Sequence, residues 1–336
     1  MTVTIGYDVG GAHLKVARIE DGRVTAVRQI SCPLWQGLDR LDAAIAEASA
    51  LTGSADHHAV TMTAELCELF ATRHDGVIML AKHLSASLGT NTRFYRGLQG
   101  VGDLASVIAN TDAVASANFL ATAHVIAARQ PKALLIDMGS TTTDIIACDR
   151  PQGLSDAERL QTGELVYTGF TRTAVPSVTA RAPLAGQWQT LARDAFATMA
   201  DVRRVLGELL EDIDRHATSD GRGTSVEESL ARFARGFGRD AEMRHLATWQ
   251  VSAAYLRDVQ LRSIYDGAIQ VLSRPGLEVT RIIAAGIGAP VAHAIANRLG
   301  LPCTEFGNLI NAAPDCRLWA TRCAPAVAVG MLGSSP

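Results

Sequence analysis

The first residues with a pattern suited to chemistry lie near the start of the chain. A glycine pair, Gly10-Gly11, follows Asp8 and precedes His13 and Lys15. Glycines let backbone N–H groups approach a phosphate without obstruction by Cβ, and a carboxylate at a strand end suits Mg²⁺ held through oxygen or water. Because residues two apart on a strand face the same side, His13 and Lys15 would point into one space. Taken alone, the segment is better explained as an ordinary hairpin with a surface lysine, because short glycine motifs are common.

A second segment repeats this pattern with more polar side chains. Asp137 follows an apolar run, Gly139 turns the chain and Asp144 closes the segment. Four consecutive hydroxyl side chains follow the glycine: Ser140, Thr141, Thr142 and Thr143. Backbone N–H groups and hydroxyls can hold a phosphoryl group while the two carboxylates hold a metal ion. The alternative is a polar strand whose threonines favour β structure, but two matched segments favour a phosphate site.

A third glycine turn, at Gly286 and Gly288, separates an expected strand from an expected helix. Such a turn can cover a nucleotide or another flat group, with the helix N-terminus facing an anion. A dinucleotide-binding Rossmann turn would carry a third glycine and an acidic residue downstream, and this segment has neither. We therefore expect a cover for a bound group rather than a dinucleotide site.

Apolar periodicity predicts the elements that would position these turns. In the first half it favours strands at 3–9, 13–19, 24–30, 58–62 and 77–80, and helices at 38–51, 64–72 and 114–129. In the second half it favours strands at 133–137, 142–148, 160–167 and 279–284, and helices at 291–299 and 324–332. A long helical stretch is expected at 188–272, interrupted by a polar loop at 216–225.

Both halves begin with a strand, an acid, a glycine turn and a returning strand. The two acids, Asp8 and Asp137, lie 137 − 8 = 129 residues apart. Repeated halves of this size indicate two similar domains that face each other across a cleft. We expect the first domain at 1–130 and the second at 131–317, with a helical insertion at about 188–272 and a C-terminal helix at about 318–336 that packs back on the first domain.

The composition limits the partners. The 31 Lys+Arg nearly balance the 34 Asp+Glu, which argues against nucleic acid or an anionic membrane as the main partner. Apolar residues make up 48% of the chain, enough for a sizeable core, and no apolar run is long enough to span a membrane. The six cysteines are scattered and no secretory signal precedes the first strand, so we expect free thiols and a cytoplasmic location. The only lysines are Lys15, Lys82 and Lys132, which draws attention to Lys15.

The order of the three turns resembles the actin, sugar-kinase and Hsp70 superfamily, with its two phosphate loops and its adenosine loop. Segments 61–66, 162–169, 197–202 and 235–240 resemble signatures of the hydantoinase/oxoprolinase-like branch. Within it, the chain is similar to the tetrahydromethanopterin-linked one-carbon pathway proteins and to the methanofuran synthases. The resemblance implies an α/β fold with two ribonuclease H-like (actin-like ATPase) domains facing across a cleft and a helical insertion in the second.

The resemblance also implies a transferase. It would join an (aminomethylfuranyl)methyl diphosphate to the phenol oxygen of a glutamyl-tyramine or glutamyl-tyrosine unit and release diphosphate. In this interpretation Asp8, Asp137 and Asp144 hold Mg²⁺. The diphosphate is held by Lys15, Ser140, Thr141, Thr142 and the loop glycines Gly10, Gly11 and Gly139, with Gly286 and Gly288 covering the bound group.

The base for the phenol is expected to be Glu65, which would alternatively bind the substrate amine or complement a helix dipole. His13 is the reserve base. Five arginines of the insertion are candidates for holding a glutamyl carboxylate, although solvated helix faces explain most of them: Arg203, Arg204, Arg232, Arg235 and Arg239.

Two other classes of function stay open at this point. One is an ATP-dependent enzyme, either a small-molecule kinase or a hydantoinase/oxoprolinase-type ATPase, and only this alternative requires ATP. The other is a nucleotide-binding scaffold of the actin type. We expect small-molecule substrates and neither nucleic acid nor membrane as partners, with a homodimer left open.

Overall fold

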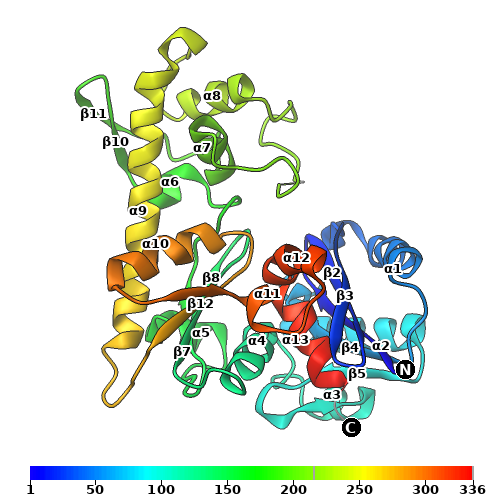
Figure 1. Ribbon diagram of the computed structural model, residues 1–336. Coiled ribbons are helices and arrows are strands. Elements are labelled where there is room, and N and C mark those ends of the chain that lie inside the picture. The colour runs from blue at the N-terminus through cyan, green and yellow to red at the C-terminus, as the bar shows by residue number, and fades with distance from the viewer. Residues whose placement is uncertain (215, 335–336) are drawn as a thin grey trace.

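Two mixed β-sheets form the body of the computed structural model, which describes residues 1–214 and 216–334 (Figure 1). The first sheet has the order β3-β2-β1-β4-β5-β6. Its strands are β1 (Val3–Val9), β2 (His13–Glu20), β3 (Arg23–Ser31), β4 (His57–Met62), β5 (Thr92–Tyr95) and β6 (Val101–Gly102). The second sheet has the order β13-β12-β7-β8-β9. Its strands are β7 (Ala133–Met138), β8 (Thr143–Ala147), β9 (Leu165–Val166), β12 (Arg281–Ala285) and β13 (Cys303–Glu305).

The two sheets repeat one topology. In the first, β1, β2 and β3 form an antiparallel meander and β4 lies parallel to β1. In the second, β7, β8 and β9 form the meander and β12 lies parallel to β7. The register also repeats, because Asp8 pairs with Lys15 in one meander and Asp137 pairs with Asp144 in the other. The predicted fold class, two ribonuclease H-like domains of α/β type, is confirmed.

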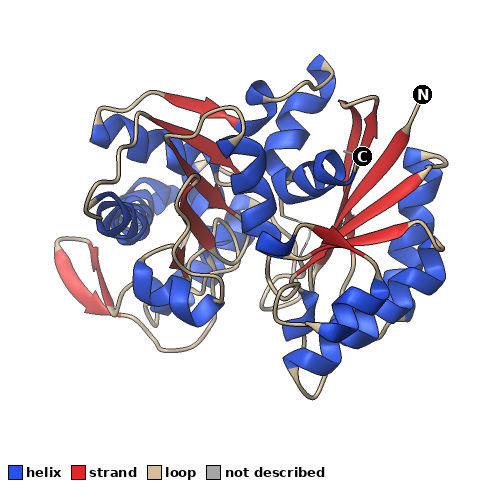
Figure 2. Cartoon of the chain, turned by 90° about the horizontal axis from the view of Figure 1, so that it is seen from below, coloured by secondary structure: helices blue, strands red, loops and turns tan. Residues whose placement is uncertain are grey.

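Helices cover both sheets and fill the space between them (Figure 2). Those before the insertion are α1 (Asp39–Thr52), α2 (Arg73–Leu88), α3 (Leu104–Ala109), α4 (Asn118–Ala127), α5 (Asp156–Thr162) and α6 (Val175–Val178). Those from the insertion onward are α7 (Met199–Leu206), α8 (Val226–Arg235), α9 (Leu246–Leu272), α10 (Ala289–Leu299), α11 (Phe306–Leu309), α12 (Arg317–Arg322) and α13 (Ala324–Gly333). No helix in the described part of the chain is both long and apolar enough to cross a membrane.

Helices α4 and α13 join the two halves through one shared core. Their apolar residues cluster with those of β2, β7, β8 and β12, so burial of a single apolar surface ties both sheets together. Helix α13 packs closely on β1, where a Cβ added at Gly6 would lie 2.6 Å from the backbone nitrogen of Gly330. The single helix predicted at about 318–336 is divided into α12 and α13, and α13 packs on the first sheet. Residues 335–336 of the predicted helix lie outside the described part of the chain.

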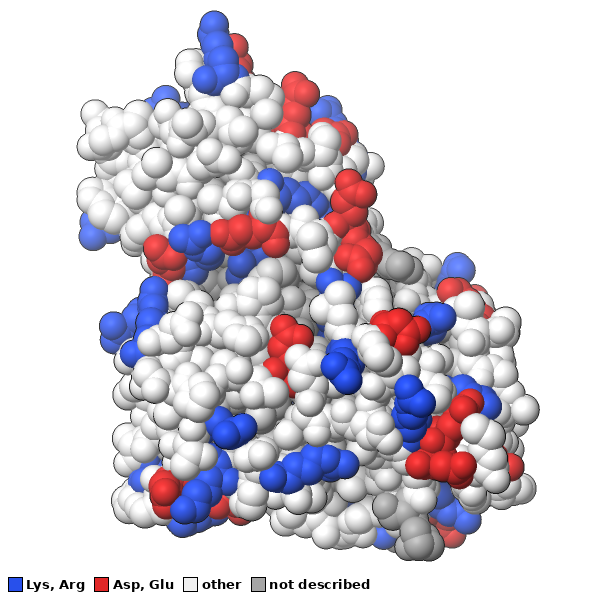
Figure 3. Space-filling view, in the orientation of Figure 1, with Lys and Arg blue, Asp and Glu red and all other residues white. Residues whose placement is uncertain are grey.

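A lobe formed by the insertion stands away from the two-sheet body (Figures 1 and 3). It consists of α7, α8, the first half of α9 and the hairpin β10 (Arg181–Leu184) and β11 (Gln187–Thr190). Its core is aromatic, because the rings of Phe233, Phe237 and Trp249 pack edge to face with centroids 5.2–5.9 Å apart. On the face shown in Figure 3, positive and negative side chains are interspersed.

None of the five candidate arginines of this lobe lines the cavity between the two sheets that is described below, and two of them are buried with partners inside the lobe. Arg203 is buried and donates hydrogen bonds to the Phe170 carbonyl and to Gln260. Arg232 is fully buried and lies 2.8 Å from Asp201 and 3.1 Å from Asp220. The expectation that such arginines hold a glutamyl carboxylate is wrong for these two, because their guanidinium groups already have partners inside the lobe.

Replacing Arg232 with alanine should lower the free energy of unfolding of the lobe by roughly 3 kcal/mol, because it removes a fully buried guanidinium from Asp201 and Asp220. Asp201 then keeps only the longer 3.7 Å contact with Arg204 and the hydrogen bond from the Thr198 N–H. Arg244→Ala is the matched control, since it removes only an exposed pair with Glu242 and should leave stability almost unchanged. Urea unfolding followed by circular dichroism, with limited proteolysis of the lobe, measures both. A loss below about 1 kcal/mol for Arg232→Ala would contradict this view of the lobe.

The largest errors of prediction in the first half fall at 64–80. The strand predicted at 77–80 lies inside α2, because its apolar residues continue at helical spacing to Ala81 and Leu84, and Thr72 caps the helix by accepting a hydrogen bond from the Asp75 N–H. The helix predicted at 64–72 is only the short 3₁₀ turn η2 (Ala64–Leu66). A short apolar run does not by itself distinguish a strand from a helix, and the strand prediction for 77–80 is wrong for this reason.

Other boundaries also differ. The strand predicted at 160–167 begins in the last turn of α5, which a capping box of Ser155 and Glu158 starts, and only its residues in β9 are extended. The helix expected from 114 begins at Asn118, because Ser116 has a φ of 49° that no α-helix accepts. The helical stretch expected from 188 starts inside the hairpin β10–β11. The sequence patterns also do not predict the short strands β5, β6 and β13.

Candidate active site

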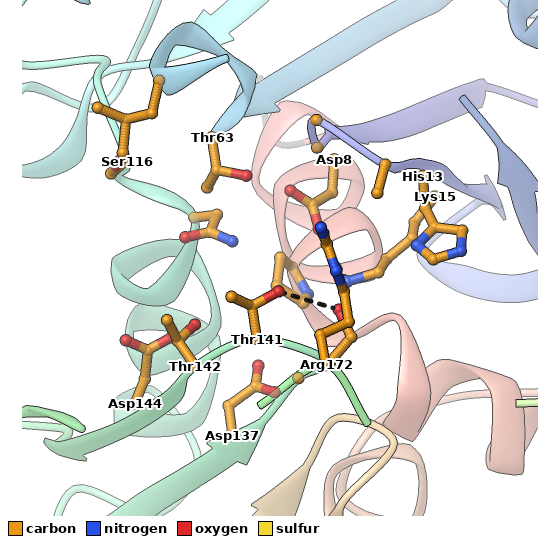
Figure 4. A pocket seen from close by; sticks show the side chains of 18 of the residues that line it. Asp8, His13, Lys15, Thr63, Ser116, Asp137, Thr141, Thr142, Asp144 and Arg172 are labelled. Carbon is orange, nitrogen blue, oxygen red and sulfur yellow. Dashed lines mark hydrogen bonds and ion pairs between the residues drawn. The ribbon is translucent and has the colours of Figure 1, made fainter. Parts of the chain in front are cut away.

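A cavity of about 380 Å³ lies between the two sheets, at the turns that follow β1 and β7. Figure 4 shows Asp8, His13 and Lys15 on one side of it and Asp137, Thr141 and Arg172 on the other. Eleven of the fourteen residues predicted for the site line this cavity: Asp8, Gly10, Gly11, His13, Lys15, Asp137, Gly139, Ser140, Thr141, Thr142 and Asp144. The fold therefore brings the two matched segments together, as the cleft hypothesis requires.

The two turns have the same backbone geometry. The Gly10 N–H donates to the His13 carbonyl at 3.0 Å, and the Gly139 N–H donates to the Thr142 carbonyl at 3.0 Å. Neighbouring segments hold each turn from behind: the Leu34 N–H donates to the Gly11 carbonyl at 3.0 Å. On the other side, the Phe170 and Arg172 N–H groups donate at 2.9 Å to the carbonyls of the second turn. The Gly10 and Gly139 N–H groups are thus occupied within their turns, and these fixed turns suit anion binding only through the N–H groups of their other residues.

The charges facing the cavity perturb one another. Lys15 Nζ lies 3.3 Å from Asp8 Oδ2. Burial alone would lower the pKa of Lys15, but the attraction of Asp8, Cys323 and Asp137 outweighs it and raises this pKa to about 12, so the lysine stays cationic. Burial, followed by the repulsion of Asp144 and Asp8 and against the attraction of Lys15, raises the pKa of Asp137 to about 7. A cation bound near Asp137 would therefore stabilise its ionised carboxylate.

Two carboxylates at the floor of the cavity, Asp8 and Asp137, have the donor chemistry that a divalent cation requires. Among the described residues, Asp8 Oδ1 is buried without a hydrogen-bond partner, and burial together with the nearby Asp144 and Asp8 raises the pKa of Asp137. Carboxylate oxygens are the ligands that Mg²⁺ prefers. Within residues 1–214 and 216–334, no group of three His, Cys, Asp or Glu side chains is arranged to hold a metal. An ion here would therefore need oxygens from water and from the bound ligand as well.

Asp144, the third expected metal ligand, pairs with an arginine at the cavity wall. Its Oδ1 accepts a hydrogen bond from Arg159 Nη1, and the same guanidinium donates to Asp156 at 2.6 Å. Arg159 also stacks over the Phe119 ring, with its Cζ 3.9 Å from the centroid. One oxygen of Asp144 is thus occupied by Arg159, while the residue still lines the cavity, so its role as a metal ligand stays a prediction.

Glu65 lies behind the cavity wall rather than on it. It is only 1% exposed, and its Oε1 accepts a hydrogen bond from Ser116 Oγ at 2.8 Å and lies 3.5 Å from Arg73. Burial raises the pKa of Glu65, although Ser116 and Arg73 oppose this shift. The expected role as the base for a phenol does not match this placement, because Ser116 separates the carboxyl from the cavity.

Gly286 and Gly288 do not line the cavity either, and Ile287 between them does. Gly286 has a φ of 78°, and a Cβ there would lie 2.5 Å from Asp137 Oδ1. The Gly288 N–H donates to the Met138 carbonyl at 2.9 Å. The glycines therefore let this turn pack on the end of β7, and the cover expected from them comes from Ile287.

Several residues that line the cavity are not among those predicted for the site from the sequence. Arg172 reaches the cavity because its backbone N–H is bonded to Ser140, and Figure 4 shows it among the site residues. His216 comes from the polar loop of the insertion, and its ring lies 4.6 Å from that of His13. Trp35 and Tyr167 also line the cavity while staying exposed. Tyr167 lies in the family-like segment 162–169 and His216 in the polar loop 216–225. No pattern in the sequence shows that these residues, Trp35 and Arg172 meet at one cavity, because that depends on the tertiary structure.

Comparisons with known proteins agree with this geometry. A protein of Methanocaldococcus jannaschii named (4-{4-[2-(gamma-L-glutamylamino)ethyl]phenoxymethyl}furan-2-yl)methanamine synthase is 30% identical over 243 residues, which are 71% of this chain and 72% of that protein. The protein of the same name from Methanococcus vannielii is 32% identical over 105 residues, 30% of this chain and 47% of that one.

Among solved structures, nucleotide-free acetone carboxylase superposes with a TM-score of 0.53 at 11% identity, covering 89% of this chain and 68% of that one, which supports the fold alone. The model of the hydantoinase/oxoprolinase family matches residues 56–309. This match spans well over half of the sequence, and so the chain belongs to the hydantoinase/oxoprolinase family.

Proposed function

We propose that this protein is a transferase of methanofuran-type cofactor biosynthesis that displaces diphosphate from an (aminomethylfuranyl)methyl diphosphate with the phenol oxygen of a glutamyl-tyramine or glutamyl-tyrosine acceptor. The observation that carries the proposal is the 30% identity, over 71% of the chain, to a synthase whose name describes a furan joined to a phenol through an ether. The two phosphate-binding turns on either side of the cavity supply the second requirement, a site for diphosphate.

The reaction forms one carbon–oxygen bond and breaks another. The phenol oxygen bonds to the furanylmethyl carbon, the bond from this carbon to the diphosphate oxygen breaks, and the phenol proton passes to a base. Positive charge that develops on the methylene carbon is delocalised into the furan ring. Stabilising the departing diphosphate therefore lowers the barrier most directly, because this group gains negative charge in the transition state.

The chain offers cations and N–H donors for that purpose from both sides of the cavity. Lys15 approaches from the first sheet and Arg172 from the second, so a diphosphate between them would accept charge-assisted hydrogen bonds from each. The N–H groups of the other residues in both glycine turns add neutral donors. Asp8 and Asp137 would hold Mg²⁺ against the diphosphate, and this ion would supply charge neutralisation of the leaving group.

His13 and His216 are the side chains best placed to accept the phenol proton. Both line the cavity, and they come from opposite domains with rings 4.6 Å apart. Burial, and then the positive charge of Arg172, lowers the pKa of His216, so this imidazole is neutral at pH 7 and able to accept a proton. These two histidines replace Glu65 as the proposed base.

Incubation of the purified protein and Mg²⁺ with two sets of substrates tests the proposal. With the furan diphosphate and a glutamyl-tyramine acceptor, we expect the aryl ether and diphosphate in equal amounts and no requirement for ATP. With ATP and the acceptor alone, we expect no phosphorylated acceptor and no ADP. ATP consumption without any ether would reject the transferase and favour the ATP-dependent alternative.

A further inference from the structure

The mouth of the cavity carries two exposed aromatic side chains, one from each domain. Tyr167 is 69% exposed and Trp35 is 45% exposed, and both line the cavity. The cavity floor is different, because Asp8 and Asp137 are 3% and 8% exposed and charged groups surround them. A site with a polar, buried floor and an aromatic mouth fits a ligand that has a charged end and a flat apolar body.

Each aromatic residue is fixed beside one of the phosphate-binding turns. Trp35 lies in the 3₁₀ turn η1 (Leu34–Gln36), and the hydrogen bond from the Leu34 N–H to the Gly11 carbonyl ties this turn to the first phosphate loop. Tyr167 directly follows β9, whose residue Val166 pairs with Thr143 at the end of the second loop. In both halves the aromatic residue comes shortly after the third strand of the meander, so the internal repeat places the two rings on either side of one cavity.

The other exposed tryptophan, Trp188, lies away from the cavity. Trp188 is 55% exposed on β11, where it packs edge to face with Tyr255 at 5.3 Å between centroids, and it does not line the cavity. Leu66, 56% exposed, and Ile287 add apolar surface at the cavity. Exposed apolar surface of this kind gains free energy when a ring covers it, and aromatic rings prefer stacked or edge-to-face contacts.

We infer that Trp35 and Tyr167 are specificity-determining residues that hold the phenol ring of the acceptor at the mouth of the cavity. The inference rests on the proposed function and names the part of the site that recognises its second substrate. The furan substrate has a diphosphate that the two loops can hold, whereas the acceptor has no phosphate, and its phenol ring is the flat apolar part that an aromatic surface can recognise. The aromatic pair next to the loops supplies the matching surface and keeps the phenol oxygen near the methylene carbon.

The test compares Trp35→Ala and Tyr167→Ala with Trp35→Phe and Tyr167→Phe, and uses Trp188→Ala as the matched control. We expect KM for the acceptor to rise roughly tenfold in each alanine variant, because one ring contact is lost, and to stay near the wild-type value in the phenylalanine variants. KM for the furan diphosphate and the affinity for inorganic diphosphate with Mg²⁺ should stay within about twofold of wild type in every variant. Because both side chains are exposed, the fold should persist in all of them.

Direct titration of the acceptor into protein preloaded with Mg²⁺ and inorganic diphosphate distinguishes failure of the aromatic acceptor site from failure of the proposed function. Equal acceptor affinity in wild type and both alanine variants would overturn the inference and leave the transferase standing. A rise in KM for the furan diphosphate instead of the acceptor would overturn it too, because the rings would then hold the furan. If the wild type binds diphosphate but no acceptor and forms no ether, the proposed function fails and the inference fails with it.

Discussion

Replacing Lys15 with methionine should reduce kcat/KM by about 100- to 1,000-fold, the loss expected when one preorganised charged donor to a developing anion is removed. The ammonium lies 3.3 Å from Asp8, and its pKa is raised to about 12, so it is charged throughout the working range of pH. Methionine keeps the length and the apolar stem of the side chain. The variant should also bind inorganic diphosphate more weakly in calorimetric titration, whereas affinity for the acceptor should change little.

The chain offers a matched control, because Lys82→Met makes the same substitution at an exposed position of α2. This variant should keep the activity of the wild type. Lys15→Arg should recover part of the loss, since it restores a cation without restoring the geometry of the ammonium. A Lys15→Met enzyme with kcat/KM within about threefold of wild type would show that Lys15 does not bind the leaving group.

Replacing Asp137 with asparagine should have opposite effects on stability and activity. In the folded protein without Mg²⁺ or ligand, burial and the nearby Asp144 and Asp8 raise the pKa of Asp137 to about 7. Because this pKa lies above the value in the unfolded chain, the folded protein loses stability as pH rises between about 4 and 7, and the full cost is present at pH 8. Asparagine stays neutral, so the variant should be more stable than wild type at pH 8, by on the order of 4 kcal/mol.

This advantage should disappear below about pH 4, where the wild-type carboxyl is protonated in both states. Thermal unfolding at several pH values, with and without Mg²⁺ and diphosphate, measures the difference in stability between the variant and the wild type. The ligands should reduce this difference because they compensate the charge of the wild-type carboxylate. The exposed Asp149→Asn variant is the control and should follow the wild type. We expect activity of Asp137→Asn to fall at least about 100-fold. An Asp137→Asn protein that is less stable than wild type at pH 8 would contradict the electrostatic description of the cavity.

The duplication was accessible from the sequence because it has a local signal. The acid, the glycine turn and the returning strand recur after 129 residues, and the structure repeats the register and the hydrogen bond of the turn at the same interval. The equivalent positions then differ in charge: Lys15 occupies the place that Asp144 occupies in the second half. Asp144 instead pairs with Arg159, and no local sequence pattern predicts this partner.

The parts of the site that sequence reasoning missed depend on contacts between distant segments. His216 meets His13 from a loop about 200 residues away, and Arg172 is positioned by a backbone bond to Ser140. Glu65 follows a strand that ends beside the cavity, but the short turn η2 and the positive φ of Ser116 place its carboxyl behind the wall. Periodicity and motif spacing describe single elements, so they do not show whether a side chain faces the cavity or the protein interior behind it.

The central claim is that the phosphate-binding cleft holds a substrate diphosphate as the leaving group and needs no ATP. An acceptor labelled with ¹⁸O at the phenol, incubated with the furan diphosphate and Mg²⁺ without ATP, tests it most directly by mass spectrometry of the products. We predict an ether that retains the label and one unlabelled diphosphate for each ether formed. An ether that forms only when ATP is added, or one that has lost the label, would contradict the claim.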